Sequence, residues 1–386
     1  MSTKVGIVNV NDYENVPKAV VAGIKLIEND LTYDFLEAKD ILLKPNLLSA
    51  NKKACTQPSF VKGAISYLKQ LGVSMDKVKI GDSPGQNKTS AYKVAKEIGL
   101  FEVCEKEGLK IIDFEEGTPL NGKINGAIRM KEYYVAKAVY DCDILINLPK
   151  LKTHAEATIT GAIKNYWGII PGGQKAKLHL LGKSAQKFGE VLADNFSWIV
   201  NNKPNRLNIY DLQEIMEGPK GPGAGKMVEW NLILVGTDEL ALDIIALEIG
   251  KYNAKFVPHL KNAKDRKLGV GILEDIEIVG MALEDAKKQV PKFKIPSKFL
   301  TRIDSYFSGR TYYKVAKKIP KLNEKECEKC GQCSEICPAD AINFEAKHYP
   351  RFIRKKCIAC LCCMEMCPQH AIDVKRRGIG GFIHSY

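Results

Sequence analysis

The chain has 386 residues, of which 45% are hydrophobic and 27% are charged, and this composition is typical of a soluble globular protein. No stretch approaches the roughly 18 consecutive apolar residues of a membrane-spanning helix, and the residues from Met1 to Val10 lack the organisation of a signal peptide. The net charge of +13 suits an acidic partner. We therefore expect a cytoplasmic protein with no membrane span, and we do not expect nucleic acid as a partner, because no aromatic-interleaved recognition motif lies in the main body.

Short apolar or β-branched runs alternate with helical stretches over the first 280 residues. The predicted strands are Val5–Val10, Ile41–Lys44, Val78–Gly81, Lys110–Phe114, Ile144–Asn147 and Leu207–Tyr210. The predicted helices are Pro17–Glu28, Pro58–Leu71, Ala91–Ile98, Ser184–Asn201 and Thr237–Ile249. Strands that alternate with helices predict an α/β main domain with a mostly parallel, layered sheet.

Two predicted strands early in the chain end in polar residues. Lys44-Pro45-Asn46 closes one, and Gly81-Asp82-Ser83-Pro84-Gly85 closes the other. We predict Asp82 as a catalytic residue that orients a lysine or moves a proton, and Lys44, Asn46 and Ser83 as cofactor-binding residues. Turn chemistry alone explains Asp-Ser-Pro-Gly equally well.

The richest group of polar residues follows the strand Ile144–Asn147. It comprises Leu148-Pro149-Lys150-Leu151-Lys152-Thr153-His154 and then Gly161-Ala162-Ile163-Lys164-Asn165. Ligands of open α/β sheets bind beyond the carboxyl ends of the strands, and a crowded lysine or histidine can titrate near neutrality and move protons. Each lysine alone is better explained as a hydrated surface charge, whereas the group indicates a site. The predicted catalytic residues are Lys152, His154 and Lys164, and the predicted cofactor-binding residues are Asn165 and His179.

Several carboxylates further along the chain have two explanations. Asp211 and Glu217 precede a glycine-rich loop, and Asp238 and Asp243 belong to one predicted helix. Asp238 and Asp243 would form a hydrated face of that helix; the alternative is that these carboxylates bind a metal or pair with lysines. The loop itself, Gly218–Lys226, is not a nucleotide P-loop, because Lys220 stands where the first glycine is required and Met227 replaces the Ser or Thr. We therefore predict no ATP site there, and no glycine fingerprint supports a nicotinamide or flavin site.

Residues Met281 to Lys321 contain eleven Lys or Arg against three acidic residues, together with several aromatic residues. We interpret this segment as a basic aromatic connector that is helical at Ser297–Phe307. Its aromatic residues would pack on the main body, and its charges would either stay hydrated or attract an acidic redox partner. The predicted division is an α/β domain at 1–282, the connector at 283–321 and a small α+β domain at 322–386.

The small domain contains two runs of the form C-x2-C-x2-C-x3-C-P, each ending in a proline, Pro338 and Pro368. This repeated spacing is that of bacterial two-cluster ferredoxins, in which the fourth cysteine of each run ligates the other cluster. We predict two 4Fe–4S clusters, the first on Cys327, Cys330, Cys333 and Cys367, and the second on Cys357, Cys360, Cys363 and Cys337. Such clusters suit a reducing, oxygen-poor cell.

Zinc and disulfides are the alternatives. Structural zinc usually takes paired C-x2–4-C hooks rather than four-cysteine runs, and disulfides need an oxidising compartment.

Cys362 lies beside Cys363, so it could replace Cys363 as a cluster ligand, although a packing role explains it better. Among the single cysteines, Cys55 follows Lys52 and Lys53, which would lower its pKa.

Several of these motifs occur together and in the same order in a known family. They are Lys44-Pro45-Asn46, Gly81-Asp82-Ser83, Leu148–His154, Gly161–Asn165, Met216-Glu217-Gly218 and Gly221-Pro222. The chain is similar to the iron–sulfur proteins grouped as domain of unknown function 362, with a C-terminal ferredoxin module. The resemblance implies an iron–sulfur protein of the kind found in anaerobic microbes and archaea. The cluster cysteines carry over one by one, but the family supplies no catalytic residues.

Two functions follow from these features. The first is an iron–sulfur oxidoreductase that passes electrons between two 4Fe–4S clusters and a substrate or cofactor in the α/β domain; a small anion is one candidate substrate. The second is a non-catalytic carrier of the ferredoxin type, whose large domain docks a partner redox enzyme. Either function requires a redox partner protein, such as a ferredoxin or an oxidoreductase.

Overall fold

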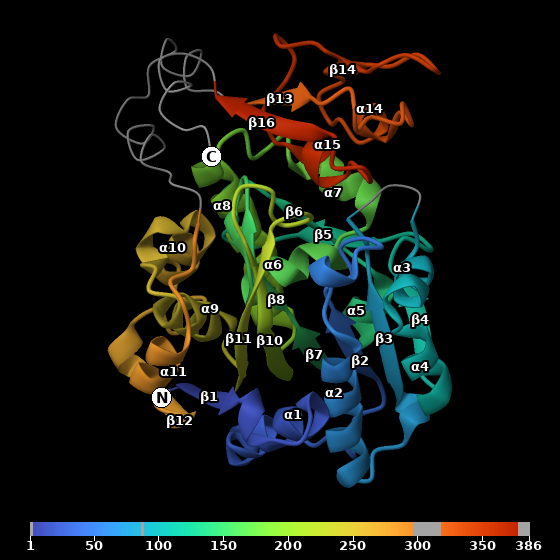
Figure 1. The fold of residues 1–386 in the computed structure, drawn as a ribbon. Coiled ribbons are helices and arrows are strands. Elements are labelled where there is room, and N and C mark those ends of the chain that lie inside the picture. The colour runs from blue at the N-terminus through green and yellow to red at the C-terminus, as the bar shows by residue number, and fades with distance from the viewer. Residues whose placement is uncertain (1–2, 86–88, 296–317, 377–386) are drawn as a thin grey trace.

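A computed structural model describes residues 3–85, 89–295 and 318–376. Ten of the described strands form one mixed, mainly parallel sheet in the order β12-β1-β11-β10-β7-β2-β3-β4, with β8 and β9 attached to β10 (Figure 1). These strands are β1 (Thr3–Asn9), β2 (Ile41–Pro45), β3 (Val78–Asp82), β4 (Lys110–Asp113), β7 (Ile144–Leu148), β8 (Lys150–His154), β9 (Thr158–Thr160), β10 (Arg206–Glu217), β11 (Lys226–Gly236) and β12 (Ile276–Gly280). The predicted α/β fold with a mostly parallel sheet is confirmed.

The parallel half of the sheet consists of β10, β7, β2, β3 and β4. Each pair of adjacent strands within this set is parallel. The other half is mixed, since β11 pairs antiparallel with both β1 and β10, and β12 pairs in parallel with β1. Because the strands of the parallel half run in one direction, their carboxyl ends meet at one edge. That edge is where the predicted polar residues lie.

The sequence did not predict β8, and the expectation that each of its lysines alone is a hydrated surface charge is wrong. All five residues from Lys150 to His154 are buried, because β8 pairs in parallel with β10 and antiparallel with β9. The strand predicted at Leu207–Tyr210 is also longer, and it continues to Glu217 as β10. The lysines Lys150 and Lys152 are therefore interior groups and not hydrated surface charges.

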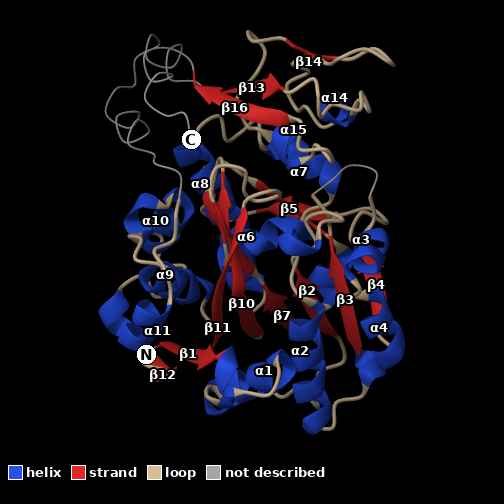
Figure 2. Cartoon of the chain, in the orientation of Figure 1, coloured by secondary structure: helices blue, strands red, loops and turns tan. Residues whose placement is uncertain are grey.

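Helices cover both faces of the sheet, as the colouring by secondary structure shows (Figure 2). They are α1 (Val16–Lys25), α2 (Pro58–Gln70), α3 (Ala91–Ile98), α4 (Phe101–Glu107), α5 (Lys137–Asp141), α6 (Ala162–Asn165), α7 (Gly172–Leu178), α8 (Ala185–Asn202), α9 (Glu239–Ile249), α10 (Pro258–Asp265) and α11 (Leu283–Gln289). Side chains of Asn15, Ser90, Ser184 and Asp238 cap the amino ends of α1, α3, α8 and α9. Two separate apolar cores result.

The C-terminal part is small and built of short elements. Two antiparallel pairs join β13 (Lys318–Leu322) with β16 (Ile372–Arg376) and β14 (Ile342–Asn343) with β15 (Arg351–Phe352). One-turn helices α14 (Gln332–Glu335) and α15 (Cys362–Glu365) contain the third cysteines of the two runs, Cys333 and Cys363. Another small hairpin, β5 (Leu120–Lys123) and β6 (Glu132–Val135), belongs to the main body. The C-terminal part lies over one end of the large sheet (Figure 1).

The beginning of the predicted connector packs on the main body. Phe293 is buried, and its ring lies 5.8 Å from that of Trp230 in an edge-on arrangement. The predicted helix Ser297–Phe307, together with Tyr312 and Tyr313, falls outside the described residues. Within the described residues, no helix has both the length and the apolar character needed to cross a membrane.

Candidate functional site

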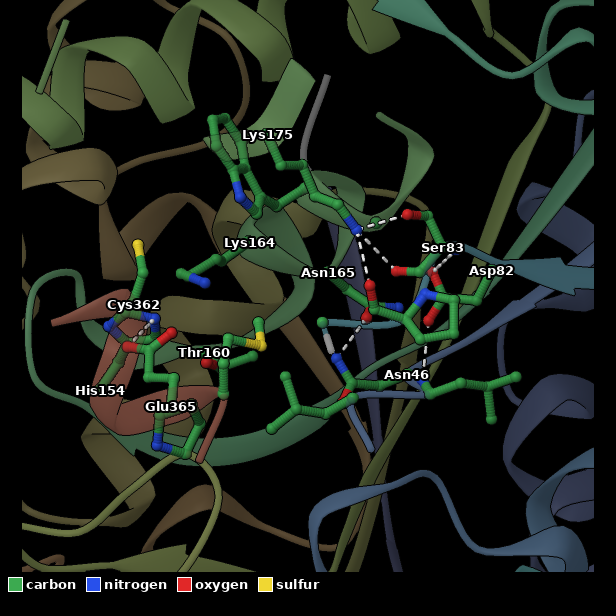
Figure 3. Close-up of a pocket in the computed structure, with 18 of the residues that line it drawn as sticks. Asn46, Asp82, Ser83, His154, Thr160, Lys164, Asn165, Lys175, Cys362 and Glu365 are labelled. Carbon is green, nitrogen blue, oxygen red and sulfur yellow. Dashed lines mark hydrogen bonds and ion pairs between the residues drawn. The ribbon is translucent and has the colours of Figure 1, made fainter. Parts of the chain in front are cut away.

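A cavity of about 270 Å³ lies at the carboxyl ends of β2, β3 and β8. Its walls come from two distant parts of the chain. The main body contributes residues that follow these strands together with α6 and α7, and the C-terminal part contributes Ile336, Cys362, Glu365 and Met366. Figure 3 shows the side chains of both parts facing the same space. The volume is slightly below the usual range of small-molecule sites, about 300–1,000 Å³, and suits a small ligand.

Lys44 and Asp82 form a buried ion pair beside the cavity. The Lys44 ammonium lies 2.8 Å from Asp82 Oδ1, and Asp82 Oδ2 accepts a hydrogen bond of 2.7 Å from the Leu47 amide. Burial lowers the pKa of Lys44, although the carboxylate opposes this shift. A Cβ at Gly168 would lie 2.2 Å from Asp82 Oδ1, so only glycine lets this backbone approach the pair. The ion pair therefore holds the ends of β2 and β3 together. Both carboxylate oxygens of Asp82 are already engaged in contacts within the protein.

A chain of asparagine side chains connects the strand ends. Asn46 Nδ2 donates to Asn165 Oδ1 at 2.8 Å, and Asn165 Nδ2 donates to Asn147 Oδ1 at 2.7 Å. Asn147 then donates to Asn208 at 2.8 Å. Because each amide satisfies the next, these buried groups hold β2, β7, β10 and α6 in register. Asn46 and Asn165, both predicted as binding residues, lie together on the cavity wall.

Lys152 projects from β8 into the same wall and is fully buried. Its ammonium donates to Asn46 Oδ1 and to the Ala54 carbonyl, both at 2.6 Å. Burial, assisted by the nearby cations Lys164 and Lys150, lowers its pKa to about 7. A lysine with this pKa can exist in either protonation state at neutral pH, so it can bind an anion or move a proton.

Lys175 was not predicted as a site residue, yet it closes the opposite side of the cavity from α7. Its ammonium donates to the carbonyls of Ser83 and Pro84, at 2.9 and 3.0 Å, and also to the Ser83 hydroxyl. Burial lowers the pKa of Lys175 to about 8, against the opposing effect of Glu115. The only signal in the sequence was its place shortly after Pro171-Gly172-Gly173. Ser83 was predicted as a binding residue, but its carbonyl and its hydroxyl both accept hydrogen bonds from Lys175.

His154 stands at the end of β8 in a defined tautomer. Its Nδ1 accepts hydrogen bonds of 3.1 Å from the amides of Glu156 and Ala157, so the proton of a neutral ring resides on Nε2. Nε2 lies 3.2 Å from Glu365 Oε1 of α15. Burial raises the pKa of Glu365 to about 7. Glu365 was missed by the sequence analysis, because only the packing of the two parts of the chain brings it to His154.

His179 forms the far wall with Glu156. Its Nδ1 lies 3.0 Å from Glu156 Oε2, and its ring stacks on Phe188 at 4.7 Å. Burial alone would lower the pKa of His179, but the carboxylate of Glu156 outweighs burial and the pKa is raised. The predicted residue therefore lies at the cavity in a pair that favours its charged form.

Lys164 and Thr160 are the polar groups of the cavity with the fewest contacts. Lys164 lies on α6, and no hydrogen bond or ion pair joins its ammonium to the described residues. Burial lowers its pKa, opposed by Glu365 and Glu156. The buried hydroxyl of Thr160 also has no hydrogen-bond partner among the residues that the structure covers. Figure 3 shows Lys164 between Lys175 on one side and Thr160 with Cys362 on the other.

The sequence left the roles of Asp211 and Asp243 open, and the structure shows that both hold elements of the fold together. Asp211 pairs with Lys150 at 2.8 Å, and both side chains are fully buried. Asp243 is buried as well and accepts hydrogen bonds from the amides of Ala162 and Ile163, at 2.7 and 3.1 Å. Asp243 therefore caps the amino end of α6, and burial raises its pKa to about 7. The lysine-pairing alternative therefore holds for Asp211, and the interpretation of Asp243 as part of a hydrated face is wrong.

The glycine-rich segment joins β10 to β11, as predicted, and it covers part of the cavity through Pro222. The Thr153 hydroxyl donates to the Gly218 carbonyl at 2.7 Å, and Asn51 donates to the Gly223 carbonyl at 2.8 Å. These contacts hold the segment against the ends of β8 and β2.

The eight motif cysteines surround two small cavities. Cys327, Cys330, Cys333 and Cys367, here called the outer cysteine set, line one of them. Cys337, Cys357, Cys360 and Cys363, here called the inner cysteine set, line the other. Four thiols around each cavity fit the four-cysteine ligation of a 4Fe–4S cluster. All twelve cysteines are free, and among the described residues no three or more His, Cys, Asp or Glu side chains converge on a single metal ion.

Cys55 shows no sign of a reactive thiolate. It is fully buried, and burial raises its pKa despite Lys152 nearby. Its thiol donates to the Ser49 carbonyl at 3.1 Å. The neighbouring Lys52 and Lys53 therefore do not activate it.

Comparisons with known proteins agree with these features. Residues 41–248 match the family model described as domain of unknown function (DUF362), and residues 319–368 match that of a 4Fe-4S dicluster domain. The thylakoid-associated protein sll1697 of Synechocystis sp. is 32% identical over 234 residues, which cover 60% of this chain and 68% of that protein.

Two solved structures are similar at 12% identity. The lactate racemase apoprotein of Thermoanaerobacterium thermosaccharolyticum matches 64% of this chain and 56% of its own with a TM-score of 0.41. A protein of Thermotoga maritima matches 55% of each chain with a TM-score of 0.35. The chain thus spans little more than half the length of either structure.

The family match covers more than half of this chain, and the predicted ferredoxin module is confirmed. The chain belongs to the family described as domain of unknown function 362, and its C-terminal part is a ferredoxin-type 4Fe-4S domain.

Proposed function

We propose that the protein is an oxidoreductase that transfers electrons between two 4Fe–4S clusters and a substrate or second cofactor held in the 270 Å³ cavity. The outer and inner cysteine sets would each hold one cluster, and a bound cluster accepts and donates single electrons. The proposal includes the division into domains at 1–282 and 322–386 with a connector between them. It also includes a cytoplasmic, oxygen-poor setting.

The observation that carries this proposal is the position of α15. Cys362 of this helix lines the main cavity and also the cavity of the inner cysteine set. The neighbouring residue, Cys363, belongs to the inner set, and Glu365 of the same turn contacts His154. A ligand in the main cavity would therefore be separated from the inner set by a single turn of helix.

The two cysteine sets differ in exposure, which suggests the direction of the path. Two cysteines of each set are buried, but Cys330 of the outer set is exposed, whereas no cysteine of the inner set is. A partner protein can therefore approach the outer set, and the inner set faces the main cavity. The partner would be a ferredoxin or another redox protein.

The polar residues of the cavity divide into supporting and reacting groups. Lys44 and Asp82 neutralise each other and hold the strand ends in place. Lys152, with a pKa of about 7, and His154, with its proton on Nε2, are the groups best placed to donate protons to a reduced substrate. His179 would add positive charge. A small anion suits this surplus of cations.

The test uses protein prepared without oxygen and reduced chemically. The rate at which each of a panel of small anions reoxidises the protein is compared with the rate for a dye that reacts at the surface. We expect the double variant Lys152→Ala, His154→Ala to reoxidise at least about 100-fold more slowly with an active anion, because proton transfer is removed. The rate with the dye and the iron content should not change.

An equal effect on both rates, or no effect on either, would favour the non-catalytic carrier, whose large domain only docks a partner. Lys177→Ala serves as the matched control, because Lys177 is exposed on α7 and does not line the cavity.

A further inference from the structure

The cations of the main cavity are of two kinds. Lys152 and Lys175 are anchored, since each donates at least two hydrogen bonds to fixed protein oxygens. Lys44 is neutralised by Asp82. Lys164 differs from these three, because no bond joins its amine to the described residues although it lines the cavity. Two fixed charges and one free amine therefore face the same small space.

An anchored ammonium and a free amine serve different purposes. A fixed cation attracts an anion and orients it, whereas a desolvated lysine with a lowered pKa is a nucleophile toward carbonyl groups. Lys164 belongs to the second class because, unlike Lys152 and Lys175, its amine is held by no hydrogen bond to the described residues. Burial also lowers its pKa, although Glu365 and Glu156 oppose the shift. The Thr160 hydroxyl, buried and without a hydrogen-bond partner among the described residues, lines the same cavity and offers a polar group to a ligand.

We infer that the cavity binds a small carboxylate that also bears a carbonyl group, and that Lys164 holds this molecule as an imine. The inference rests on the proposed role of the cavity as the substrate site. Lys152 and Lys175 would attract the carboxylate. The Lys164 nitrogen forms a bond to the carbonyl carbon, and the carbonyl oxygen leaves as water with the two protons of the amine. No oxidant or reductant is required for this step.

Glyoxylate is a suitable probe, because it is the smallest carboxylate that carries an aldehyde. The full-length protein, prepared without oxygen and with oxidised clusters, is treated with glyoxylate and sodium cyanoborohydride near pH 7. The hydride converts an imine into a stable carboxymethyl amine, which is located by peptide mass spectrometry. We expect modification at Lys164 at least about tenfold faster than at exposed lysines, because its lowered pKa leaves more free amine at pH 7 and the neighbouring cations concentrate the anion.

Lys177 is the internal control, because it is exposed on the adjacent helix α7. Lys164→Arg keeps the positive charge but is no nucleophile, so it should abolish the rapid modification. Lys175→Arg should slow modification of Lys164 without moving it to another residue. Oxalate, an anion without a reactive carbonyl, should compete with glyoxylate in the wild type.

Modification of Lys164 no faster than that of Lys177 would overturn the imine, as would rapid modification centred on Lys152 or Lys175. Circular dichroism and iron content show whether each variant is folded. The labelling requires no electron transfer, so its failure leaves the proposed oxidoreductase standing. Conversely, rapid labelling in a protein that fails the reoxidation test would retain the imine and reject the electron transfer.

Discussion

Asp82→Ala is expected to lower the free energy of unfolding by about 3–5 kcal/mol, because it leaves the Lys44 ammonium buried without its counter-ion. The side chain of Lys44 is fully buried, and Asp82 Oδ1 lies 2.8 Å from its ammonium. The substitution also removes the acceptor of the Leu47 amide. Urea denaturation of protein prepared without oxygen measures the loss. The surface pair of Lys69 and Glu107 provides the control, and Glu107→Ala should cost about 1 kcal/mol or less.

A second variant separates the buried charge from a general disturbance of the strand end. The double substitution Lys44→Met, Asp82→Leu removes both charges, so it should recover most of the stability lost in Asp82→Ala. If Asp82→Ala costs no more than Glu107→Ala, the description of a buried, mutually dependent pair is wrong.

Cys363→Ala is expected to remove about half of the iron, roughly four of roughly eight atoms for each chain, because it deletes one ligand of the inner cysteine set. Cys362→Ala should keep its iron, although Cys362 is the adjacent residue and also lines the inner cavity. Iron analysis and paramagnetic resonance of the reduced, anaerobic proteins measure the difference. The pair of variants decides which of the two neighbouring thiols is a ligand. Loss of iron in Cys362→Ala with retention in Cys363→Ala would contradict the assignment.

The sequence predicted the sheet well where its signals are local. The predicted strands Ile41–Lys44, Val78–Gly81 and Ile144–Asn147 correspond to the parallel strands β2, β3 and β7. Because the carboxyl ends of parallel strands share an edge, the residues after them were expected to meet, and they do line one cavity. The spacing of the cysteines is equally local, since each run folds into one loop and one short helix.

The sequence was less informative where tertiary packing decides. Lys150 and Lys152 have the character of surface residues, but pairing of β8 with β10 buries them, and Asp211 neutralises Lys150. Asp243 was assigned to a hydrated face, yet it caps a helix that is distant in sequence. Glu365 reaches His154 only because the ferredoxin-type domain packs over the sheet. Such contacts join residues many positions apart, and hydrophobic periodicity contains no information about them.

The account depends on the main cavity lying beside the inner cysteine set and away from the outer one. A redox titration monitored by paramagnetic resonance tests this arrangement in the wild type and two matched variants. His179→Gln removes a positive charge from the main cavity, since Glu156 favours the charged form of His179, and Lys329→Gln removes one from the wall of the outer cysteine cavity.

Loss of a nearby positive charge destabilises the reduced state, so each variant should lower one potential by an amount on the order of tens of millivolts. We predict that His179→Gln lowers the potential of the cluster that is missing in Cys363→Ala, and that Lys329→Gln lowers the other. If His179→Gln left both potentials unchanged, or shifted only the outer one, the cavity would not be the place where electrons from the inner cluster arrive.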